Sequence, residues 1–132
     1  MRKHGKSELS KIQRKLWELC RQIALKRFSK DGKVDCYTCG AKDIQGANRQ
    51  LGHLWAKASL GAFLKYDMRV LRWQCWLCNI HRGGMGADFR RNMEAEIGKR
   101  AMNKLEKDRQ KLVNAKDHYL NLISEYENEL DM

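Results

Sequence analysis

Hydrophobic residues recur every three or four positions in the first part of the chain, from Leu9 to Ala24. Basic side chains occupy the opposite face, which is the pattern of an amphipathic helix. Ser7 is a suitable N-cap, and the run from Ser29 to Gly32 is a turn signal. We therefore expect a basic helix over residues 7–29, preceded by a mobile basic tail at residues 1–6.

The middle of the chain lacks helical periodicity. Residues 33–100 hold four of the five cysteines and two of the four histidines. The segments 50–55 and 69–74 are short enough to be strands, and we predict that both are. This stretch is therefore expected to form a compact core with a small sheet.

The helical pattern returns after Ala87 and continues to the end of the chain. It allows one very long helix, or two helices with a bend near Gly98 or around Lys107 and Asp108. The apolar stripe from Leu105 to Leu130 suits a dimer interface and packing against the N-terminal helix equally well. We expect one domain over residues 1–132, made of a basic helix (7–29), a core (33–100) and a helical extension (101–132).

The composition indicates a polyanionic partner. The 132 residues include 27 Lys and Arg against 16 Asp and Glu, a formal net charge of +11. Nucleic acid is the commonest partner of so basic a chain, and the alternative is a charged surface that only aids solubility. No apolar run approaches the roughly 18 residues of a membrane span, and the basic N-terminus lacks the apolar segment of a secretory signal. We expect neither membrane insertion nor export.

Four of the five cysteines form two C-x-x-C pairs. Without an export signal the chain is expected in a reducing compartment, where paired cysteines indicate metal binding rather than disulfides. Two such pairs supply the four ligands of a tetrahedral Zn²⁺ site, whereas the alternative is a set of unligated buried thiols. A site with four thiolates has no open position, so the zinc is predicted to be structural. The predicted ligands are Cys36, Cys39, Cys75 and Cys78.

Three further polar residues lie at notable places relative to these pairs. His53 lies in the first candidate strand, and Asn79 follows the last cysteine directly, with His81 two residues later. Asn and His can bind a divalent cation alongside water and phosphate oxygens. A neutral histidine can also take a proton from water that attacks a phosphodiester. His4 and His118 have no such neighbours, and we interpret both as structural or surface residues.

This arrangement resembles the His-Me finger (HNH) nucleases, and it is more closely similar to the NinG/Rap family of bacteriophage recombination proteins. The similarity covers roughly residues 16 to 98. The segments that carry it are Leu16-Trp17, Cys36-Tyr37-Thr38-Cys39-Gly40, Gly52-His53-Leu54, Tyr66-Asp67, Gln74-Cys75-Trp76-Leu77-Cys78-Asn79, Gly84 and Phe89-Arg90.

The resemblance implies an α+β fold with a small zinc-braced ββα-metal core between an N-terminal helix and long C-terminal helices. It implies a metal-dependent, structure-specific endonuclease that cuts branched DNA such as Holliday junctions and D-loops, in the bacterial cytoplasm if the protein is phage-encoded. His53 would be the general base, and Asn79 would help to hold a catalytic Mg²⁺ or Mn²⁺. Many HNH enzymes have Asp before the histidine, where this chain has Gly52. A second ligand is therefore expected from His81 or Asp67.

A nuclease of branched DNA needs basic side chains near its site, and two cuts across a junction suggest a homodimer. The expected phosphate contacts are Lys57, Lys65, Arg69, Arg72, Arg82, Arg90 and Arg91. Two other functions stay open: a non-catalytic zinc-binding DNA-binding module in phage recombination or replication, and a zinc-braced scaffold whose acidic C-terminal end binds another protein. The enzyme is favoured because a pure zinc ribbon has no need of His53 and Asn79 at these places.

Overall fold

The computed structural model describes residues 7–132, so the expectations for residues 1–6, His4 among them, lie outside the described residues. The chain has a mixed α+β fold with one two-stranded sheet. Its helices and strands are α1 (Glu8–Phe28), β1 (Arg49–His53), α2 (Ala62–Lys65), β2 (Leu71–Cys75), a π-helical turn η4 (Leu77–His81), α3 (Gly86–Ile97), α4 (Lys99–Asp108) and α5 (Ala115–Leu130), and short 3₁₀ turns lie at η1 (Gly46–Asn48), η2 (Lys57–Ser59) and η3 (Met68–Val70).

Helix α1 forms as its sequence predicts. The Ser7 side chain accepts a hydrogen bond from the Ser10 backbone N–H at 3.0 Å, which satisfies one of the free donors of the first turn. The helix ends at Phe28, where the Ser29 backbone N–H donates to the Leu25 carbonyl. Most of its apolar stripe is buried, and Cys20 on that face is a buried thiol.

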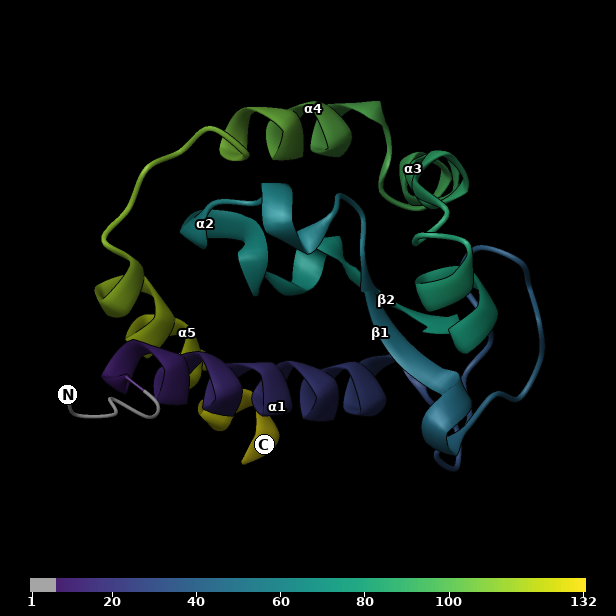
Figure 1. Cartoon of the computed structure of the whole chain (residues 1–132), viewed down its shortest axis with the longest axis horizontal. Coiled ribbons are helices and arrows are strands. Elements are labelled where there is room, and N and C mark those ends of the chain that lie inside the picture. The colour runs from purple at the N-terminus through teal and green to yellow at the C-terminus, as the bar shows by residue number, and fades with distance from the viewer. Residues whose placement is uncertain (1–6) are drawn as a thin grey trace, which may run out of the picture.

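The two predicted strands form an antiparallel hairpin in which Arg49 pairs with Cys75 and His53 with Leu71. Each differs from its predicted limits by one or two residues. All five residues of β2 are buried, Arg72 and Gln74 included. The sheet therefore lies inside the molecule, with α1 and α5 along one side and α3 and α4 around the other (Figure 1).

The C-terminal region contains three helices, so the predicted choice between one helix and two is wrong. Gly98 separates α3 from α4 with a φ of +89°, which side-chain-bearing residues rarely adopt. A second break, at residues 109–114, separates α4 from α5. Both of the positions proposed for a bend are therefore used.

Helix α5 packs against α1 of the same chain (Figure 1). Its buried residues are Tyr119, Leu122, Ile123 and Tyr126. At one end the Arg27 guanidinium pairs with the Glu129 carboxylate at 2.6 Å. Of the two uses predicted for the C-terminal stripe, packing within the chain is therefore the one observed. Within residues 7–132, no helix has the length and apolar character needed to cross a membrane.

Candidate active site

The four paired cysteines meet at one end of the hairpin. Their four Sγ atoms all lie within 4.8 Å of one another. The first pair is attached to the sheet by the Tyr37 backbone N–H, which donates to the Trp73 carbonyl at 2.9 Å. Four thiolates at this spacing can hold a zinc ion in a closed tetrahedral site. Among the described residues this is the one cluster of three or more His, Cys, Asp or Glu side chains suited to a metal.

His53 ends strand β1, and its ring is largely buried. Its Nε2 atom lies 2.9 Å from the Lys65 carbonyl oxygen. A carbonyl can only accept, so Nε2 carries the proton and Nδ1 keeps its lone pair. Burial lowers the pKa of His53 to about 4, and the positive charges of Lys57 and Lys65 act in the same direction. His53 is therefore neutral near pH 7 and able to accept a proton at Nδ1.

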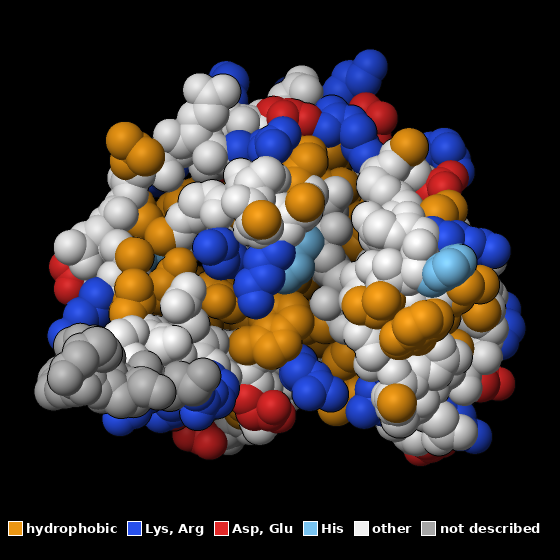
Figure 2. Space-filling model, in the orientation of Figure 1, with side chains coloured by type: hydrophobic (Ala, Val, Ile, Leu, Met, Phe, Trp, Pro, Cys, Tyr) orange, Lys and Arg blue, Asp and Glu red, His pale blue; other side chains and the backbone are white. Residues whose placement is uncertain are grey.

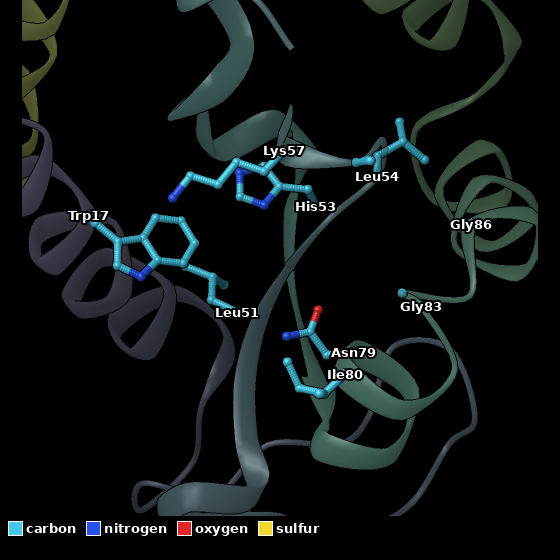
Figure 3. A pocket seen from close by; sticks show the side chains of 11 residues that line it. Trp17, Leu51, His53, Leu54, Lys57, Asn79, Ile80, Gly83 and Gly86 are labelled. Carbon is cyan, nitrogen blue, oxygen red and sulfur yellow. The ribbon is translucent and has the colours of Figure 1, made fainter. Parts of the chain in front are cut away.

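An indole from α1 fixes the plane of the His53 ring. The Trp17 ring lies 5.4 Å from the imidazole, centroid to centroid, at an interplanar angle of 7°. The Lys57 ammonium lies 4.9 Å from the centre of the same indole and 5.5 Å from that of Tyr66. The imidazole is thus held by a carbonyl at its edge and an aromatic ring on its face. Figure 3 shows Trp17, Lys57 and His53 close together.

A cleft of about 340 Å³ opens beside this histidine. Asn79 lines it from η4, and Figure 3 shows the amide of Asn79 pointing toward the space below His53. Lys57 and Ile80 also line it, and the glycines from 83 to 86 form another wall. No carboxylate is found among the described residues of this lining. The cleft therefore combines a neutral base, an amide and a cation.

A chain of amides sets which atom Asn79 presents. The Gln50 side-chain NH₂ donates to the Ala47 carbonyl at 2.8 Å, so the Gln50 oxygen faces Asn79. That oxygen accepts from the Asn79 NH₂ at 3.4 Å. The remaining polar atom, the oxygen Oδ1 of Asn79, is therefore free to bind a cation, a water molecule or a phosphate-bound ion in the cleft.

Position 52 has no room for a side chain, so it requires glycine. A Cβ atom at this position would lie 1.8 Å from Oε1 of Gln74 and 3.1 Å from Oδ1 of Asn79. Gln74 is fully buried, and its NH₂ donates to the Gly84 carbonyl at 2.8 Å and to the Thr38 hydroxyl at 3.0 Å. The space that a side chain at position 52 would need is thus filled by a glutamine from the opposite strand.

The two other residues predicted as metal ligands, His81 and Asp67, lie elsewhere. His81 is exposed and stacks on Trp76, with the ring centroids 6.4 Å apart. Asp67 caps the 3₁₀ turn η3 and forms an ion pair with Arg69 at 2.9 Å. Neither residue lines the cleft. Of the predicted ligand set, only Asn79 faces it, so a cation there would depend on water and substrate phosphate for its other ligands.

The family model described as "Bacteriophage Lambda NinG protein" matches residues 2–132. The chain belongs to the NinG family. The comparisons with curated proteins and with solved structures each gave no match. Membership confirms the NinG part of the resemblance and indicates a role related to phage recombination.

The predicted phosphate contacts of this NinG-family chain fall into two groups. Lys57, Lys65 and Arg82 have no carboxylate partner among the described residues. The other four are held by carboxylates of the same chain, and one of these, Arg72, is also buried. The ion pairs are Arg69 with Asp67 and Asp108, Arg72 with Glu96, Arg90 with Glu106, and Arg91 with Asp88.

The sequence gives only partial signs of three residues that shape this NinG site. Trp17 was part of the family resemblance, but the sequence predicted no role for it beside His53, which is 36 positions away along the chain. The Lys65 residue was predicted for its charge, whereas its carbonyl is what orients the imidazole. Gln74 has one usable sign, because a glycine inside a strand often marks the close approach of another group.

Proposed function

We propose that this member of the NinG family is a metal-dependent, structure-specific DNA endonuclease that acts on branched recombination intermediates such as Holliday junctions and D-loops. The observation that carries the proposal is the state of His53, which is neutral, held at Nε2 by the Lys65 carbonyl, and free at Nδ1 beside Asn79. A histidine that ends the first strand and an asparagine on the helical turn after the second are also the layout of a His-Me finger core.

The chemistry is hydrolysis of a phosphodiester. A water oxygen forms a bond to phosphorus, its proton passes to Nδ1 of His53, and the bond from phosphorus to the leaving oxygen breaks. The Lys57 ammonium attracts the phosphate into the cleft. A Mg²⁺ or Mn²⁺ ion held by Asn79, water and phosphate would stabilise the charge on the leaving oxygen.

The cysteine cluster has a positioning role in this proposal. Asn79 directly follows Cys78, and the second cysteine pair spans the junction of β2 and η4. Zinc bound by Cys36, Cys39, Cys75 and Cys78 would join this junction to the first cysteine pair. With zinc bound, the four cysteines would hold η4, and with it Asn79, in place relative to His53 on the neighbouring strand.

The test is cleavage of a synthetic four-way junction and a matched linear duplex in Mg²⁺ or Mn²⁺. Wild type should cut the junction in preference to the duplex, and His53→Ala should not cut. His118→Ala is the matched control, because His118 binds the Phe63 carbonyl away from the cleft. A wild type that cuts no DNA would refute the enzyme, equal cutting by His53→Ala would refute the base, and equal cutting of both substrates would refute structure specificity.

Two symmetric cuts require two active sites, so we propose that the protein acts as a homodimer on a junction. The buried stripe of α5 is occupied by α1 and is not the surface for this contact. Sedimentation of the protein bound to one junction measures the number of copies. A single copy on a junction that is cut in both strands would contradict the dimer.

The second candidate is a non-catalytic, zinc-braced DNA-binding module. The observation that favours it is the absence of a carboxylate among the described residues that line the cleft, because Mg²⁺ sites usually contain one or two. This module would bind branched DNA with an affinity that falls as the salt concentration rises. It would leave the DNA intact in every divalent ion tested.

A further inference from the structure

The turn after β2 exposes a cluster of apolar side chains. Trp76 is 48% exposed, Leu77 40% and Ile80 53%. Figure 2 shows hydrophobic side chains gathered beside an exposed histidine over this part of the molecule. Several large apolar side chains exposed on one turn usually mark a binding surface. We call Trp76, Leu77, Ile80 and His81 the Trp76 surface.

The Trp76 surface is held rigidly. The Trp76 backbone N–H donates to the side-chain oxygen of Asn48 at 2.8 Å. Cys75 and Cys78 of the metal cluster lie on either side of the exposed pair Trp76 and Leu77. The Trp76 ring is stacked on that of His81 at an interplanar angle of 17°. Two aromatic rings are therefore presented to solvent in a fixed orientation, at little entropic cost on binding.

This surface is continuous with the cleft. Ile80 belongs to the Trp76 surface and also lines the cleft that contains His53 and Asn79. Arg82, exposed on the same turn, has no carboxylate partner in the part of the chain that the structure describes. Flat aromatic faces beside a free cation suit a single nucleic-acid strand, because bases stack on the rings while the cation attracts the phosphates.

We propose that the Trp76 surface binds unpaired or unstacked bases of branched DNA next to the phosphodiester that enters the cleft. The inference rests on the proposed DNA substrate and adds how a branch is distinguished from a duplex. In an intact duplex every base is covered by its neighbours, so the surface has nothing to stack on. At a branch point bases are less constrained, and stacking on an aromatic ring replaces the contacts they lose.

Charge argues against a second copy of the chain as the occupant. Arg82 is exposed on the same turn and lies beside the surface. A symmetric contact through this face would bring the two Arg82 side chains and the two clefts together. DNA instead complements the charge and leaves the cleft in contact with its substrate.

The test measures binding without cleavage, with zinc-loaded full-length protein in the His53→Ala background. Fluorescence anisotropy compares a four-way junction carrying unpaired bases at its centre with a matched linear duplex. Trp76→Ala should weaken junction binding about ten-fold or more, the loss expected for one stacked base, and change duplex binding by less than about two-fold. Trp76→Phe should recover most of the affinity, and Leu112→Ala, on an exposed loop, should change nothing.

Further measurements keep the outcome decisive if Trp76→Ala disturbs the turn. Bound zinc is measured for every variant, and Ile80→Ala serves as a second probe outside the cysteine pair. The fluorescence of 2-aminopurine placed at the branch should be quenched by the protein that retains Trp76, and quenched less by the Trp76→Phe variant. Wild-type junction affinity in Trp76→Ala, an equal loss on duplex, or a change from dimer to monomer in sedimentation would each overturn the inference. Because none of these measurements needs cutting, loss of the proposed enzyme activity would leave this result standing.

Discussion

Replacing Gly52 by alanine places a methyl group where the side chain of Gln74 already lies. The new Cβ would be 1.8 Å from Oε1 of Gln74 and 2.9 Å from its Cδ. Neither atom can move away easily, because the Gln74 side chain is fully buried and its NH₂ is hydrogen-bonded to the Gly84 carbonyl and the Thr38 hydroxyl. The strand or the glutamine must therefore move.

The cost has two parts. Overpacking in a closely packed interior costs about 1–3 kcal/mol. Displacing the fully buried Gln74 amide separates its NH₂ from the Gly84 carbonyl and the Thr38 hydroxyl, which costs about 1–3 kcal/mol more. The sum of about 2–6 kcal/mol is a large part of the about 5–15 kcal/mol that keeps a domain folded.

The assay is urea unfolding followed by tryptophan fluorescence at saturating zinc. Gly61→Ala is the control, since a Cβ there meets no atom within 4 Å and its φ is −75°. Gln74→Ala removes the obstruction, so the double variant should be less destabilised than the sum of the single variants by about 1 kcal/mol or more. A Gly52→Ala protein as stable as wild type, or strictly additive effects, would refute the reasoning. Gly52→Asp should lose at least as much stability and gain no cleavage.

Three other outcomes follow from the site. The pKa of His53 is about 4 in the folded chain against 6.5 for the free side chain, so the unfolded chain binds the proton more readily. Stability should therefore fall as the pH drops from 6.5 toward 4, by about 3 kcal/mol in all, and urea unfolding of His53→Gln should lack this part of the pH dependence. Trp17→Ala exposes the imidazole, so the acid limb of the cleavage profile should move up toward pH 6.5 while Trp17→Phe stays near wild type. Removing zinc with a chelator should unfold the core, measured by circular dichroism, and Cys39→Ser should lower bound zinc whereas Cys20→Ala should not.

Local signals in the sequence predicted the parts of the fold that depend on neighbours in the chain. The N-cap of α1 and the two strands follow from spacing or residue type over a few positions. The meeting of the four cysteines was predicted for another reason, because two C-x-x-C pairs together make one tetrahedral zinc site. The number of C-terminal helices was wrong because Gly98 and the segment 109–114 each end a helix, and the apolar stripe continues across both breaks.

Contacts between residues far apart in the chain could not be predicted in this way. Arg72 pairs with Glu96, and Arg69 with Asp108, so neither arginine is the free cation that its place in the sequence suggests. The stacking of Trp17 on His53 likewise depends on how α1 lies against the sheet. A single sequence shows which charged and aromatic residues are present. It does not show which of them form ion pairs or stack on one another in the fold.

Pairing within the chain also changes what the net charge of +11 means for binding. Several arginines of the core are held by carboxylates, whereas Lys57, which lines the cleft, has no carboxylate partner among the described residues. Lys57 lies at its mouth, and Lys11 and Arg14 border a second groove on α1 that shares Trp17 with the cleft. A strand that enters between His53 and Asn79 would thus meet free cations on the α1 side and the aromatic Trp76 surface on the other. Electrostatic attraction would supply affinity for any DNA, and base stacking on the far side would supply the preference for a branch.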